Sequence, residues 1–162
     1  MDAQRNGEPD AVRRTTVERT SDCEVVVTRW FDAPARLVFE AWSKPELFQR
    51  WWVPKSMGMQ LHACEMDVRT GGTYRLDFGE GMDFHGRYLE VTPPSLLVWT
   101  NEEGGDRGPV TTVTFEEQDG QTLVVMTELH PSKESLDAEG LGAAEATHET
   151  FDQLDELLAS LR

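Results

Sequence analysis

Histidine is the side chain in this sequence best suited to acid–base chemistry or metal binding near neutral pH. The four histidines are His62, His85, His130 and His148. None of them forms an HxxxH pair, the spacing that places two metal ligands on one face of a helix. The sequence also lacks a GxSxG nucleophile motif and a glycine-rich phosphate-binding loop. It therefore predicts no metal site, no cofactor and no catalytic residue.

His148 is the histidine whose position suggests a role. It lies among apolar residues that recur three and four positions apart, the pattern of one helix face. It is either a satisfied core or surface histidine, or it reaches a cavity as the polar group that orients a ligand. Asp67 and Arg69 leave a similar choice, because side chains two apart share one face of a strand. They form either a structural ion pair or an anchor for an anionic ligand.

Composition excludes several classes of partner. The 162 residues include 30 acidic and 15 basic ones, which gives a formal net charge of −15. This charge disfavours nucleic acid and anionic membrane surfaces, because both attract positive patches. No apolar run approaches the roughly 18–20 residues that cross a bilayer, and the first residues lack the apolar core of a signal peptide. Cys23 and Cys64 form no CxxC pair, so we expect reduced thiols in a cytoplasmic protein.

The elements that position these side chains begin with the last one. The segment Leu141–Leu161 has the apolar spacing of a long amphipathic helix. Such a helix needs a large apolar surface to cover, and the middle of the chain can supply one. Seven β-branched or alternating segments there are expected to be strands: residues 24–31, 57–68, 73–78, 82–91, 96–100, 110–117 and 122–129.

Two short helices are expected after the first strand, starting at Asp32 and at Pro45. Consecutive strands joined by short turns form an antiparallel sheet, so the fold class is α+β. We expect a curved sheet of about six to seven strands around the C-terminal helix. Residues 1–20 are polar and without periodicity, which is typical of a disordered tail. Residues 21–162 are expected to form a single domain.

A series of short motifs indicates a family. They are Asp32-Ala33-Pro34, Val38-Phe39, Ala41-Trp42, Pro45-Glu46, Trp51-Trp52 with Pro54, the run 67–72, Gly86, and the run 90–94. In order and spacing they resemble the Hsp90-ATPase-activator-like (AHSA1-like) family of the START-like, or SRPBCC, superfamily. The resemblance covers about Ser21 to Leu161. It implies a helix-grip fold with a cavity between sheet and C-terminal helix. Superfamily members bind lipids, hormones or polyketides, and a few catalyse reactions on them.

Two features depart from that family. Ala146-Thr147 stands where many relatives have a Gly-Trp pair, so we expect a cavity of different shape. The co-chaperones that gave the family its name carry a separate N-terminal domain for Hsp90. This sequence has a polar tail in that place, so activation of an Hsp90-type chaperone is doubtful.

The expected cavity defines a set of candidate ligand-binding residues. Small side chains on the last helix leave space unless the sheet fills it, although the same residues would suit a solid core. The candidates are Trp52, Tyr74, Phe84, Trp99, Met126, His148 and Phe151.

The leading hypothesis is a protein that binds a small hydrophobic molecule without catalysis. The alternatives are an enzyme that uses His148, His85 or Glu128 as acid or base, and a protein-interaction module. A homodimer is compatible with each of these.

Overall fold

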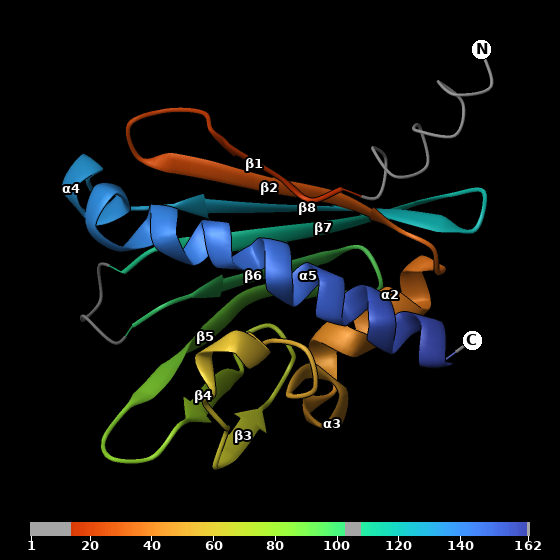
Figure 1. Cartoon of the computed structure of the whole chain (residues 1–162), viewed down its shortest axis with the longest axis horizontal. Coiled ribbons are helices and arrows are strands. Elements are labelled where there is room, and N and C mark those ends of the chain that lie inside the picture. Colours follow the sequence, from red (N-terminus) through yellow and green to blue (C-terminus); the bar gives the residue numbers. More distant parts are fainter. Residues whose placement is uncertain (1–13, 103–107, 162) are drawn as a thin grey trace.

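An eight-stranded antiparallel sheet curls around the long helix α5 (Leu141–Leu161), as the ribbon of the computed structural model shows (Figure 1). The structure describes residues 14–102 and 108–161. The strands follow the order β1 (Thr16–Arg19), β2 (Glu24–Phe31), β8 (Gln121–Leu129), β7 (Val110–Gln118), β6 (Leu96–Thr100), β5 (Asp83–Thr92), β4 (Thr73–Asp77) and β3 (Ala63–Met66). This arrangement confirms the predicted α+β class and the helix-grip fold, with eight strands rather than six to seven.

Alternating side chains give most strands one buried face, which we call the inner face because it packs toward α5 and the helices. In β2, burial alternates along the whole strand, and Val25, Val27 and Phe31 point inward. In β8 the inner row begins with Thr122, Val124 and Met126. This period of two is what a half-buried antiparallel sheet requires.

Helix α5 has the predicted bounds, and it packs mainly against β2 and α2 (Ala35–Ser43). Its buried residues are Ala144, Thr147, Thr150, Phe151, Gln153, Leu154, Leu157 and Leu158. Apart from Gln153 they follow the three- and four-residue spacing of one helix face. The apolar stripe thus explains both the helix and its position on the sheet.

The two helices after β2 bring aromatic rings into the core. Helix α2 ends at Ser43, and α3 (Pro45–Phe48) follows it directly. The Trp42 ring lies 4.7 Å from that of Trp51 and 5.8 Å from that of Phe115, both edge to face. The N-cap position of α2 is Pro34 rather than Asp32, and a proline side chain accepts no hydrogen bond. Instead the backbone N–H of Ala35 donates to Glu117 of β7 at 2.9 Å, so the sheet supplies the cap.

Two predicted boundaries are wrong. Thr16–Arg19 lie in the expected disordered tail but form β1, because they complete their backbone hydrogen bonds on the edge of β2. Residues 1–13 lie outside the described part of the chain. The strand predicted over 57–68 shortens to β3, since Lys55–Met57 form the 3-10 turn η1 between Pro54 and Gly58. Gly58 has a φ of 65°, a left-handed conformation that glycine adopts without strain.

The chain enters α5 through two short helices, α4 (Lys133–Ser135) and η2 (Leu136–Gly140). Ser132 begins α4, and its side chain accepts a hydrogen bond from the Ser135 backbone N–H. Within the residues that the structure describes, no helix is both long and apolar enough to cross a membrane.

Candidate functional site

A pocket of about 500 Å³ lies between the inner face of the sheet, the N-terminal half of α5 and the segment around η1. The sheet contributes residues from β3, β4, β5, β6 and β8. The helix contributes Ala143, Ala146, Thr147 and Thr150. These are small side chains, and they leave the space that larger residues would fill.

Most of the wall is aromatic or apolar. Trp42, Trp52, Trp99, Tyr74 and Tyr88 present rings to the pocket. Five methionines also line it, which are all the methionines of the chain apart from Met1: Met57, Met59, Met66, Met82 and Met126. Methionine side chains are unbranched and polarisable, so such a wall can adapt to ligands of different shape.

Three exposed apolar side chains mark the mouth of the pocket. Met57 is 59% exposed, Met82 49% and Phe84 41%, although all three line the pocket. They come from η1, from the turn before β5 and from β5 itself. Hydrophobic side chains of this size usually avoid water, and here they form the rim of the pocket.

Five of the seven predicted ligand-binding residues line this pocket: Trp52, Tyr74, Phe84, Trp99 and Met126. Whether they contact a ligand stays a prediction. Tyr74 is held in place by its hydroxyl, which donates to the carbonyl oxygen of Thr100 at 2.7 Å. Gly86 makes this possible, since a Cβ there would lie 2.9 Å from the Tyr74 ring and even closer to that same carbonyl.

The other two predicted residues do not line the pocket. Phe151 is completely buried and packs edge to face on Phe31, with 5.5 Å between ring centroids. His148 has an exposed side chain, and its Nε2 lies 3.3 Å from the Glu145 carboxylate. At about 100° per residue, position 148 falls about 120° from the centre of the buried stripe. His148 is spaced four and three residues from the buried Ala144 and Phe151, which suggested that it belongs to the buried stripe. It lies just outside the stripe, on the exposed side of α5.

The polar end of the pocket was not predicted as a ligand-binding site, although Glu128 was a candidate acid or base in the enzyme alternative. Glu128 is the next residue in the inner row of β8 after Met126, and it lines the pocket together with His130. Its carboxylate Oε1 lies 3.2 Å from Nε2 of His130, and the His130 Nδ1 lies 2.9 Å from the Ser135 hydroxyl. The His130 side chain is 3% exposed and that of Glu128 20%. The sequence contained one signal of this site: Glu128 continues the alternation of Val124 and Met126 and so points to the same face of the strand.

The contacts of His130 constrain its protons. A carboxylate only accepts hydrogen bonds, so Nε2 of His130 carries the hydrogen that faces an ionised Glu128. In the neutral ring Nδ1 then accepts a hydrogen bond from the Ser135 hydroxyl. Gly140 packs against this ring, and a Cβ there would lie 2.7 Å from the imidazole Cε1. The His130 ring is thus held by Glu128 at Nε2, by Ser135 at Nδ1 and by its contact with Gly140 of η2.

Asp67 and Arg69 form the structural ion pair that was one of the two interpretations. Nε of Arg69 donates to both Asp67 carboxylate oxygens, at 2.9 and 3.1 Å. Both side chains are more than half exposed, and neither is among the residues that line the pocket. An anion anchor for a ligand in this pocket is therefore not formed by this pair.

Two further groups near the pocket are held in their neutral form. Burial raises the pKa of the Cys64 thiol from 9.0 to about 11, with a smaller contribution from the charge of Glu46. Burial likewise raises the pKa of the Tyr88 phenol well above its ordinary value. Neither group acts as an anion in the pocket at neutral pH.

Helix α5 holds the segment that closes the pocket on the side of η1. The Gln153 amide donates to the backbone carbonyls of Trp51 and Val53, both at 2.9 Å, and accepts from the Lys55 N–H at 2.9 Å. One turn earlier, the Glu149 carboxylate accepts from the backbone and the hydroxyl of Ser56. These hydrogen bonds lower the pKa of Glu149. The position of the pocket wall at residues 51–57 therefore depends on two side chains of α5.

Comparison with known proteins supports this architecture. A protein from Rhodobacter sphaeroides superposes with a TM-score of 0.80 at 23% identity, over 92% of this chain and 100% of the other. A protein from Nitrosomonas europaea gives a TM-score of 0.77 at 21% identity, over 90% and 99%. One from Staphylococcus epidermidis gives 0.70 at 26%, over 91% and 95%. A search of curated proteins found no match.

The family model described as activator of Hsp90 ATPase homolog 1-like protein matches residues 32–159. This region contains the two early helices, the sheet from β3 to β8 and nearly all of α5. The fold is consistent with ligand-binding and with co-chaperone-like roles. The match covers most of the sequence, and the chain therefore belongs to the activator of Hsp90 ATPase homolog 1-like family of the START-like superfamily.

Proposed function

We propose that this protein binds one small, mostly apolar molecule in the pocket between the sheet and α5. The observation that carries this proposal is the pocket itself. Its volume of about 500 Å³ lies in the range of small-molecule sites. Its wall is largely aromatic and methionine side chains, and its polar side chains are few. A space of this composition is filled more favourably by an apolar ligand than by water.

A neutral fluorescent probe tests the proposal without knowledge of the natural ligand. N-phenyl-1-naphthylamine should bind the native protein with one molecule per chain, and its emission should increase. Tryptophan emission should fall at the same time, because Trp42, Trp52 and Trp99 line the pocket. Titration by fluorescence and a stoichiometry from calorimetry provide the two measurements.

Two substitutions that replace an alanine of α5 by phenylalanine test where the probe binds. Ala146→Phe places a ring in the pocket and should reduce probe affinity at least about tenfold, because the new side chain occupies ligand volume. Ala159→Phe adds the same ring to an exposed position on the same helix and should leave the affinity unchanged. Equal binding in both variants, or no binding to the native protein, would refute the proposal. A native protein without binding would favour the interaction role that the fold also allows.

A further inference from the structure

The charges along the pocket wall suggest which ligands it accepts. Among the described residues that line the pocket, one side chain is acidic, Glu128, one is a histidine, His130, and none is a lysine or an arginine. A fatty acid or another carboxylate would therefore bring its charge into a wall whose described residues include one carboxylate and no lysine or arginine. Like charges in a partly buried site repel each other more strongly than they do in water.

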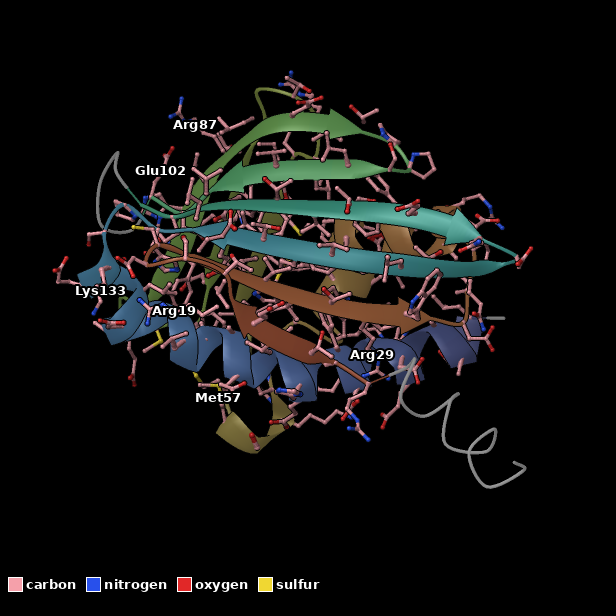
Figure 2. The ribbon with its side chains drawn as sticks, turned by 90° about the horizontal axis from the view of Figure 1, so that it is seen from above. Arg19, Arg29, Met57, Arg87, Glu102 and Lys133 are labelled. Carbon is pink, nitrogen blue, oxygen red and sulfur yellow. The ribbon has the colours of Figure 1, made fainter. Side chains whose placement is uncertain are left out.

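Three described cations form ion pairs outside the pocket. Arg19 and Lys133 lie at the α4 end of the molecule, where both pair with Asp137 at 2.7 and 2.9 Å (Figure 2). Arg87 pairs with Glu102 at 2.8 Å, near β5. None of these three lines the pocket.

Glu128 keeps one oxygen available to a ligand. Oε1 faces His130, whereas no hydrogen-bond partner of Oε2 is found among the described residues. The neighbours of Glu128 across the sheet are Val25 and Thr111, both 1% exposed, so the carboxylate stands at the edge of a buried surface. A cation placed there forms a charge-assisted hydrogen bond in a medium less polar than water.

The aromatic wall favours the same charge. Trp52, Trp99, Tyr74 and Tyr88 surround the pocket, and the face of an aromatic ring attracts ammonium groups. The formal net charge of −15 adds a long-range attraction for cations and a repulsion for anions. Three independent features of the site thus act in one direction.

We infer that the pocket selects protonated amines with an apolar body, and that Glu128 receives the ammonium group. His130 is the positioning residue: it donates from Nε2 to Oε1 of Glu128, while the Ser135 hydroxyl fixes its ring. This inference rests on the proposed binding function and specifies its ligand class. The apolar body of the amine fills the methionine-rich part of the pocket, toward the mouth at Met57 and Met82.

Three probes of equal chain length test the charge preference: decylamine, decan-1-ol and decanoate. Each is titrated against the complex of the native protein with N-phenyl-1-naphthylamine at about pH 8, where an alkylamine is protonated and a carboxylic acid is ionised. One charge-assisted hydrogen bond corresponds to about a tenfold gain in affinity. Decylamine should therefore displace the fluorescent probe about tenfold better than decan-1-ol, and decanoate should be the weakest of the three.

Two matched variants assign the preference to one carboxylate. Glu128→Gln keeps the shape of the side chain and an acceptor for His130, so the fold should survive, as circular dichroism can verify. It should remove the advantage of decylamine over decan-1-ol and leave the affinity for the alcohol unchanged. Glu116→Gln removes the same charge from an exposed position on β7 and should keep the advantage.

The outcomes separate the two proposals. If the fluorescent probe does not bind at all, the binding function itself fails. If the probe binds but all three ligands displace it from the native protein equally well, the ligand class is wrong and the binding function stands. The same conclusion follows if decanoate displaces it best. If the preference persists in Glu128→Gln, Glu128 is not the receptor of the amine. The ranking on the native protein decides the ligand class even if the variant fails to fold.

Discussion

Gln153 is the side chain whose removal tests most directly how α5 shapes the pocket. Its amide makes three hydrogen bonds of 2.9 Å, to the carbonyls of Trp51 and Val53 and to the N–H of Lys55. The residue is 8% exposed, and its hydrogen bond to the Trp51 carbonyl is buried. Gln153→Leu keeps the size of the side chain and removes all three bonds.

The expected cost follows from that count. A hydrogen bond contributes about 1 kcal/mol net, and a buried group left without a partner costs more. Three lost bonds therefore predict a destabilisation of about 3 kcal/mol or more. For a chain of this size this corresponds to a decrease in Tm of roughly 6–12 °C. Denaturant melts and calorimetry measure both quantities. Gln118→Leu, at an exposed position at the end of β7, is the control and should stay within about 0.5 kcal/mol.

Hydrogen exchange tests the local part of the argument. The Lys55 N–H donates to Gln153 in the native protein, so its exchange should become faster in Gln153→Leu, relative to amides in β8. The affinity for N-phenyl-1-naphthylamine should also decrease, because residues 52–54 are part of the pocket wall. A variant that loses less than about 1 kcal/mol and keeps Lys55 protected would show that the segment is held by packing alone, and the reasoning would be refuted.

Two other features of the structure lead to predictions. Deletion of residues 1–20 should lower the Tm, because it removes β1 from the edge of β2 and removes Thr15, which hydrogen-bonds with the buried Arg29. A deletion of residues 1–13 is the control. If both deletions give the same Tm, β1 contributes nothing to stability. Cys64 should react with iodoacetamide about 100-fold more slowly at pH 8 than a thiol of ordinary pKa, because a pKa of about 11 leaves very little thiolate. Mass spectrometry of the labelled peptide measures the rate. Rapid labelling would contradict the burial of the thiol.

The fold was largely predictable because its signals are local. The bounds of α5 follow from an apolar spacing that extends over many turns, and most strands follow from alternation between turn residues. β1 has no such signal: Thr16–Arg19 are a short, mostly exposed strand whose existence depends on the edge of β2. The turn η1 was missed for a related reason, since Met57 and Met59 looked like strand residues but serve the rim and wall of the pocket.

The candidate site was predictable only in part, because it depends on how α5 lies over the sheet. Trp99 and Met126 line the pocket, since the inward direction of a strand residue follows from alternation, and their contact with a ligand stays a prediction. The surroundings of Phe151 and His148 depend on how α5 is rotated about its axis. A rotation by one residue moves a side chain from the pocket to the core or to the surface. Sequence spacing alone does not fix this rotation.

Glu128 shows what an alternating pattern can add when it is followed to its end. The inner row of β8 is Thr122, Val124, Met126 and Glu128, and the side chains before Glu128 are buried. A carboxylate at the end of such a row either costs desolvation energy or meets a partner. Here His130 satisfies one oxygen, and the other remains at the wall of an apolar pocket. A partner of opposite charge in that pocket would offset this desolvation, and this is the physical reason to expect selectivity for amines at this site.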